Sequence, residues 1–340
     1  MKLLPCININ LNSHRVIGGD LGFISFTKSI AIFLFWLYTE NIICTGGSTM
    51  FVSQTIKLAI KSVWAIVGSI VIMLSGIING GNINCSSNAE LIKTEQFTLD
   101  EALLMSQGIT TDGEYFYTSG SIAALDLVGM AKWTADGFQK VIYNHSAIPK
   151  EIKEKYNSDH IGGISSDDGK IYAATEDEKD TYNLILIYDA ETLEFTGEYY
   201  DLGTEYLDDG IPYCAVDGEN GYLYTSQFHE TDCILAYNLD DMTFSHKIML
   251  SEPIDRIQGA EYYNGLLYMS YDVEGSATEK VQTVDVKTGK VETLFERTVS
   301  GRDHEAEGLT VYHMEDGSFI HIADYDKLIS VSIRHYALMK

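Results

Sequence analysis

Short runs of alternating hydrophobic and polar residues fill the last two thirds of the chain, and one pattern recurs among them. Each copy has a pair of small or apolar residues, a turn rich in Asp, Asn and Gly, and a strand rich in aromatic residues. The five copies span residues 107–117, 162–172, 213–224, 258–268 and 307–321. Their matching small residues, Gly108, Gly163, Cys214, Gly259 and Gly308, lie 55, 51, 45 and 49 positions apart. A period of this length with several short strands per copy is typical of a β-propeller.

Each copy predicts a blade of four antiparallel strands. In the second copy these strands cover residues 160–165, 170–175, 184–189 and 194–200, and Asp and Thr supply the last tight turn. The fifth copy holds only three strands, at residues 309–312, 318–323 and 328–336. Residues 95–99 supply the missing strand, because joining the two ends of the chain in one blade removes an open sheet edge. A short helix is expected at residues 149–156, where Pro149 precedes a charged run.

We therefore predict an all-β fold, a five-bladed β-propeller with about four antiparallel strands per blade. An N-terminal strand closes the ring. Six blades are the alternative, in which residues 90–105 contribute a further sheet.

The N-terminal region has the layout of an export signal. Residues 63–78 carry no charge, Lys57 and Lys61 precede them, and small polar residues follow up to Ser87-Asn88-Ala89. An uncleaved membrane anchor over residues 58–78 is the alternative. Met50 offers a start closer to this signal, and a second apolar run at residues 30–38 would otherwise form a membrane hairpin with it. We expect a division into an N-terminal extension (1–89) and a propeller domain (90–340), the latter secreted or membrane-anchored outside the cytoplasm.

The propeller region is strongly acidic. The whole chain has a formal net charge of −26, and residues 90–340 hold 18 basic and 47 acidic side chains, a net charge of −29. Such a surface repels phosphate backbones, which argues against nucleic-acid binding. It attracts cations and basic partners, although a solvated acidic surface that keeps a secreted protein soluble explains the charge more simply. We expect a monomer.

A functional site is expected where the channel opens. The first strand of each propeller blade lines the central channel, and ligands and ions bind at its mouth. Period-two alternation places two rows of repeat positions on the channel side. The first row is Met105, His160, Ile211, Arg256 and Glu305, and the second is Gln107, Gly162, Tyr213, Gln258 and Glu307. The predicted ligand-binding residues are Gln107, His160, Tyr213, Arg256 and Gln258; the alternative is a structural channel filled by water.

The densest group of metal-ligand side chains lies at residues 303–309, which read Asp-His-Glu-Ala-Glu-Gly-Leu. Carboxylates with amide oxygens suit calcium or magnesium, and His with carboxylates suits zinc or manganese. We predict that Glu307 and Glu305 bind one divalent cation, with calcium favoured over zinc. Alternatively, Arg256 faces the two glutamates in a buried ion-pair network without metal.

The blades resemble those of secreted propellers in the lactonase-like, NHL-like and quinoprotein-like class. Glu307-Gly308-Leu309 is similar to the start of a channel strand in gluconolactonase-type enzymes, and this resemblance implies that Glu307 is a calcium ligand. That family has six blades, and its matching Asn and Asp ligands are not recognisable here. Residues 263–268 (Tyr-Asn-Gly-Leu-Leu-Tyr) are similar to phrases in the five-bladed glutaminyl cyclases. The resemblance covers residues 95–340 as architecture.

Two functions are compatible with these patterns. The first is an extracytoplasmic propeller that binds a small molecule, glycan, ion or protein partner at the mouth of its channel. The alternative is a metal-dependent hydrolase or lactonase-like enzyme at the same mouth. Its catalytic candidates are His160 or His304 as general base, and Glu305, which also holds the ion. The sequence lacks Gly-x-Ser-x-Gly, His-Glu-x-x-His and Walker motifs, so binding is the preferred interpretation.

Overall fold

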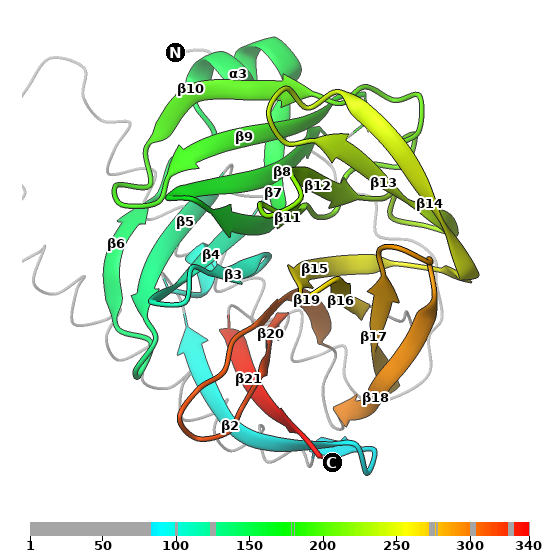
Figure 1. The fold of residues 1–340 in the computed structure, drawn as a ribbon. Coiled ribbons are helices and arrows are strands. Elements are labelled where there is room, and N and C mark those ends of the chain that lie inside the picture. Colours follow the sequence, from blue (N-terminus) through cyan, green and yellow to red (C-terminus); the bar gives the residue numbers. More distant parts are fainter. Residues whose placement is uncertain are drawn as a thin grey trace, which may run out of the picture. The chain divides into compact units, whose positions relative to one another are not determined.

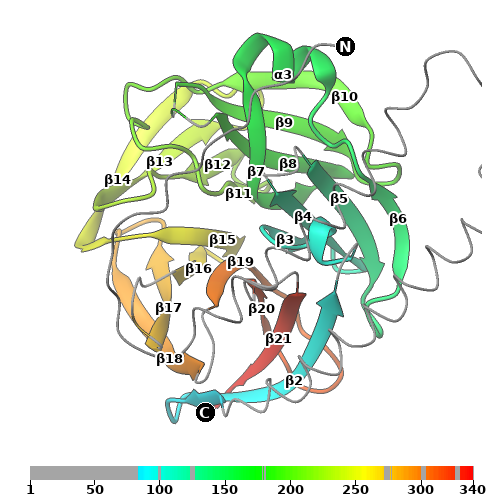
Figure 2. The same cartoon turned by 180° about the vertical axis from the view of Figure 1, so that it is seen from behind.

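The computed structural model describes residues 83–98, 101–122, 127–177, 179, 181–271, 276, 278–299, 304–325 and 330–339. Within them, five antiparallel sheets stand around a central axis and form a five-bladed β-propeller (Figure 1). The prediction of five blades is thus confirmed. The innermost strand of every blade is the first of its repeat, as the reverse view also shows (Figure 2). The last strand of the repeat is outermost in three blades, and in the other two a strand from the N-terminal part of the described chain lies outside it.

The blades follow one another along the chain. Blade 1 holds β3 (Ile109–Thr111), β4 (Tyr115–Ile122), β5 (Leu127–Thr134) and β6 (Lys140–Asn144). Blade 2 holds β7 (Ser158–Asp167), β8 (Lys170–Asp177), β9 (Asn183–Asp189) and β10 (Phe195–Asp201). Blade 3 holds β11 (Ala215–Asp217), β12 (Tyr222–Thr225), β13 (Thr231–Asn238) and β14 (Phe244–Ile254). Blade 4 holds β15 (Ile257–Tyr263), β16 (Leu266–Tyr271), β17 (Thr278–Asp285) and β18 (Val291–Val299), and blade 5 holds β19 (Glu305–Val311), β20 (Ile320–Tyr325) and β21 (Ser330–Leu338).

The N-terminal strand closes the ring, as predicted, and it does so with an extra piece. β2 (Ala89–Thr98) pairs with β21 and completes blade 5, while β1 (Ile83–Cys85) pairs with the rim strand β18 of blade 4. We call residues 83–98 the N-terminal clasp, because this segment joins the rims of two neighbouring blades. The backbone N–H of Ser86, in the turn between β1 and β2, donates to the carbonyl of Glu296 at 2.8 Å.

The first strand of the described propeller begins at Ile83. The residues expected beside a signal cleavage site, Ser87-Asn88-Ala89, lie in the turn of the clasp and at the start of β2. The apolar run 63–78, the anchor 58–78, the run 30–38 and Met50 lie outside the described residues. In the described part of the chain, no helix has both the length and the apolar character needed to cross a membrane.

The expected short helix is present between blades 1 and 2. It is α3 (Lys150–Tyr156), with Pro149 at its N-cap in an extended conformation. Ile152 and Tyr156 are its buried residues, and both join the hydrophobic cluster between these blades. The helix is therefore attached to the propeller by an apolar face.

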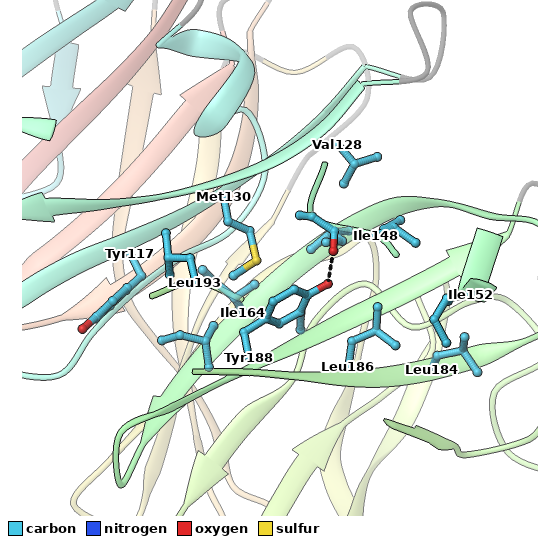
Figure 3. Close-up of a cluster of buried hydrophobic side chains, with 14 of the residues drawn as sticks. Tyr117, Val128, Met130, Ile148, Ile152, Ile164, Leu184, Leu186, Tyr188 and Leu193 are labelled. Carbon is cyan, nitrogen blue, oxygen red and sulfur yellow. Dashed lines mark hydrogen bonds between the residues drawn. The ribbon is translucent and has the colours of Figure 1, made fainter. Parts of the chain in front are cut away.

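Each seam between neighbouring blades holds one hydrophobic cluster of the described residues. Figure 3 shows the cluster between blades 1 and 2, in which Tyr117 and Met130 of blade 1 pack near Ile164 and Tyr188 of blade 2. The buried Tyr188 hydroxyl donates to the carbonyl of Ala147 at 2.7 Å. Burial of each such side chain contributes about 1.5–3 kcal/mol, so the tyrosines of the repeat stabilise the seams.

The repeated glycines allow the inner strands to approach one another closely. A Cβ atom at Gly259 would lie 2.7 Å from the Cα atom of Gly308 in the next blade, and one at Gly308 would lie 2.5 Å from the backbone nitrogen of Ile109. Real Cβ atoms do not come that close to backbone, so no side chain fits at either position. Hydroxyls also bridge neighbouring blades: Ser119 Oγ donates to the Gly162 carbonyl at 2.8 Å between blades 1 and 2, and Ser270 Oγ to the Glu307 carbonyl at 2.5 Å between blades 4 and 5.

Candidate functional site at the central channel

A β-bulge interrupts the inner strand where the repeated small residue stands. In β19, Ala306 and Leu309 are three residues apart, yet their partners Asp324 and Ile322 on β20 are only two apart. The same shift occurs in β7 between Ile161 and Ile164, and in β15 between Ile257 and Gly259. Each bulge adds one residue, so the side that faces the channel changes from one set of alternate positions to the other.

Below the bulges, the side chain of Glu261 contacts the inner strands of three other blades. Glu261 of β15 accepts hydrogen bonds at Oε2 from Thr110 Oγ1 at 2.7 Å and from Thr310 Oγ1 at 2.9 Å. At Oε1 it accepts one from Ser165 Oγ at 3.2 Å. The four side chains come from blades 4, 1, 5 and 2, so Glu261 links four of the five inner strands. We call these four residues the Glu261 layer; all of them are buried.

Burial raises the pKa of Glu261 to about 7, although the hydroxyls of Thr110, Thr310 and Ser165 act to lower it. The reason is that desolvation penalises the charged carboxylate more than these hydroxyls and the backbone N–H of Tyr262 stabilise it. This titratable group was missed by the sequence analysis. Strict alternation from Gln258 places Ala260 in the channel, whereas the bulge places Glu261 there. A signal was present, since the second residue after the small one is Thr110, Ser165, Val216, Glu261 or Thr310, polar in four of five copies.

Above the bulges, the inner strands begin. We call this end of the channel axis the mouth, and the face on which it lies the upper face. Gln107, His160, Gln258 and Glu305 stand at these strand starts on four different blades, and each is half-buried. Burial lowers the pKa of His160 to about 4, so its imidazole is neutral at neutral pH. The carbonyl of Gln107 accepts a hydrogen bond from the backbone N–H of Gly308 at 2.8 Å, which ties the start of blade 1 to blade 5.

Two further predicted ligand residues have different surroundings. Tyr213 is fully buried in the hydrophobic cluster between blades 3 and 4. Arg256 precedes β15 with a left-handed φ of 58°, and its backbone N–H donates to the Phe228 carbonyl at 2.8 Å. Its guanidinium carbon lies 5.2 Å from the centre of the Phe228 ring, a cation–π contact on the upper face.

His304 belongs to a buried charge network between blades 4 and 5. Its Nε2 atom lies 2.8 Å from Glu279 Oε1, and Glu279 Oε2 lies 2.6 Å from the guanidinium of Arg297. Arg297 in turn holds Asp324 with two hydrogen bonds of 2.7 and 2.5 Å, and Arg334 also pairs with Asp324. Burial alone would lower the pKa of His304, but its hydrogen bond and ion pair with Glu279 raise it.

The same network determines the charge state of Asp324. Burial alone would raise its pKa, but Arg297 and Arg334 lower it to about 2. His304 connects the network to the start of β19, where Glu305 follows it in the chain. Glu307, two residues further along β19, is buried, and its carbonyl accepts the Ser270 hydroxyl. Among the described residues, no group of three or more His, Cys, Asp or Glu side chains is arranged to hold a metal ion.

Comparison with known proteins adds one family. The model of a family described as "Repeat of unknown function (DUF6923)" matches residues 143–334, more than half of the chain. No curated protein matches the chain. One similar solved structure is the crystal structure of the computationally designed Ika4 protein, with 11% identity, a TM-score of 0.28, and coverage of 51% of this chain and 89% of that chain. A likeness that weak supports no conclusion about this protein.

Proposed function

Since this chain belongs to the DUF6923 family of repeats, we propose that its repeats build a binding propeller whose ligand sits at the channel mouth on the upper face. The observation that carries the proposal is the position of Gln107, His160, Gln258 and Glu305. These four polar residues belong to four blades, are half-buried, and stand at the strand starts above the level of the buried Glu261 layer. A ligand entering from the upper face would therefore meet polar groups around it and a filled channel beneath it.

The chemistry of the mouth favours a ligand rich in hydroxyl groups, such as a glycan. Two amides and a neutral imidazole each offer both a hydrogen-bond donor and an acceptor, which matches the dual character of a sugar hydroxyl. Glu305 accepts hydrogen bonds as well. Polyanions are disfavoured by the net charge of −29 on residues 90–340.

The surroundings of one predicted general base argue against hydrolysis. One general base expected for a hydrolase, His304, is engaged with Glu279 in the buried network, and this pairing favours its protonated form. Protonated imidazole cannot accept a proton from water. The divalent cation at Glu305 and Glu307 and the extracytoplasmic location both stay predictions.

The proposal is tested by screening the full-length protein on a glycan array and measuring the best hit by calorimetry. Replacing Gln107 and Gln258 by Ala should weaken binding about fivefold for each amide, because a neutral hydrogen bond contributes about 1 kcal/mol. The matched control is Q139A, which removes an exposed amide from a turn in blade 1. Equal affinity of the double variant and the control, or no glycan bound at all, would contradict the proposal.

A further inference from the structure

Glu261 is the buried titratable group that links the largest number of blades among the described residues. Its carboxylate receives hydroxyls from β3, β7 and β19, and β7 lies across the channel from β15. These inner strands also carry the mouth residues. The state of this one carboxyl group therefore affects how four blades meet at the centre of the molecule.

The hydroxyls of Thr110 and Ser165 also accept hydrogen bonds from the backbone. Thr110 Oγ1 accepts the backbone N–H of Ser166 at 3.1 Å, and Ser165 Oγ accepts the backbone N–H of Val216 at 3.0 Å. Each hydroxyl has a single hydrogen, and both point it at Glu261. The hydrogen bonds of the layer are therefore all made when Glu261 is ionised. The interactions described for this buried carboxylate include no cation, however, and burying a charge without one costs free energy.

The hydrogen-bond lengths favour one oxygen of Glu261, Oε1, as the site of protonation. Oε2 already accepts two short hydrogen bonds, whereas Oε1 accepts the longer one from Ser165. A proton on Oε1 points at Ser165 Oγ, which then accepts from Glu261 and from the Val216 N–H and turns its own hydrogen away. The bonds to Thr110 and Thr310 are retained.

Other titratable groups stand on the elements packed against β15. The carboxylates and imidazole are Asp112 beyond β3, Asp159, His160 and Asp167 on β7, Asp217 on β11, and Glu305 and Glu307 on β19. Cys214 precedes β11, and Tyr268 and Tyr271 lie on β16. His160 is neutral between pH 5 and 8, and burial raises the pKa of Cys214 and of both tyrosines, so these groups also remain neutral there.

The Glu261 layer lies close to a cavity on the opposite, lower face. A cavity of about 220 Å³ between blades 1 and 2 is lined by Thr111, Ser166 and three aspartates, Asp112, Asp167 and Asp168. Ser166 also contacts Thr110, a member of the Glu261 layer, with 3.4 Å between their hydroxyl oxygens. Two hydroxyl-bearing residues thus separate Glu261 from this acidic cavity.

We propose that Glu261 is a proton-operated latch, in which a proton on Oε1 strengthens the closure of blades 1, 2, 4 and 5 around the channel. Protonation removes the desolvation cost of a buried charge; loss of the proton restores that cost and loosens the inner strands. The latch is independent of any ligand at the mouth, because its partners are side chains of the propeller itself.

The sign of the effect follows from linkage. The pKa of Glu261 is higher in the folded than in the unfolded protein, so its contribution to stability is fully present below the unfolded value of about 4.5. The contribution declines as pH rises and is lost once pH passes about 7. Above that pH, the folded state carries the unfavourable buried charge.

The test compares thermal melts of full-length wild type, E261Q and the exposed control E219Q from about pH 5.5 to about pH 8.5. The melting temperature of E261Q minus that of wild type should increase by several degrees as pH rises. The same difference for E219Q should not change with pH. Equal pH dependence of wild type and E261Q would overturn the latch.

A second measurement keeps the test informative if E261Q does not fold. Infrared difference spectroscopy follows the C=O band of a protonated carboxyl group, and its midpoint in wild type should lie near pH 7. T310V removes one hydroxyl donor to the carboxylate at nearly constant volume, so it should raise that midpoint. A midpoint near the ordinary glutamate value, or one that T310V leaves unchanged, would overturn the proposal.

Discussion

Single residues at the channel decide how close the blades stand. Gly308 meets the backbone of residues 107–109 on one side, and Gly259 meets Gly308 on the other. The atoms that a Cβ would meet belong to the backbone, which cannot move aside as a flexible side chain can. These two positions therefore require glycine. The requirement is separate from conformational freedom, since neither glycine has a positive φ.

Replacing Gly308 by Ala should destabilise the protein by about 2–3 kcal/mol, because the new methyl group overlaps backbone atoms of blade 1. Urea unfolding followed by tryptophan fluorescence measures the change. The control G137A adds the same atom in open space and costs only the strain of a left-handed backbone, about 1 kcal/mol. If G308A is as stable as wild type, the inner strands are further apart than described.

At the scale of the element, β2 is the strand on which closure depends. Phe97 of β2 lies 5.6 Å from Trp133 and 6.0 Å from Phe138, both of blade 1, measured between ring centres. The strand therefore completes blade 5 by hydrogen bonds and fills the seam to blade 1 by side-chain packing. Its opposite face carries Ile92, which is 37% exposed.

Replacing Phe97 by Ala should lower the free energy of unfolding by about 3–5 kcal/mol, because it removes a buried aromatic ring and leaves a cavity at the closing seam. Calorimetric melting measures the loss. I92A shortens an exposed side chain of the same strand and should change stability by less than about 1 kcal/mol. Similar losses for the two variants would show that β2 is not anchored through the seam.

The elements themselves were largely predictable, because the repeat of small residue, turn and aromatic strand marks each blade locally. β1 was not, since residues 83–85 are three residues whose strand character exists only through pairing with β18. The Glu261 layer was missed for a related reason: a bulge depends on the neighbouring strand and is invisible to alternation along one strand. The pairing of His304 with Glu279 joins distant segments and likewise leaves no local trace.

The whole molecule carries a large excess of negative charge. Residues 90–340 have a net charge of −29, and self-repulsion of such a surface opposes the compact state. Ions screen this repulsion over a Debye length of about 10 Å at 0.1 M salt. The buried network of Arg297 and Asp324 is much less accessible to that screening.

Raising sodium chloride from about 0.01 M to about 0.5 M should therefore increase the melting temperature by several degrees. Potassium chloride should act equally, because screening depends on ionic strength rather than on the identity of the ion. Scanning fluorimetry in the presence of a chelator measures both series. A melting temperature that falls with salt would mean that attractive surface pairs outweigh the repulsion.

The N-terminal clasp also has a consequence for biosynthesis. β2 is the second strand of the propeller to leave the ribosome, whereas its partner β21 is among the last. β1 likewise waits for β18. Blades 1 to 3 can assemble from neighbouring segments while translation continues, but closure must wait for a complete chain. Until β18 and β21 have been synthesised, the strands of the clasp have no partners. A chain that terminates prematurely leaves them exposed.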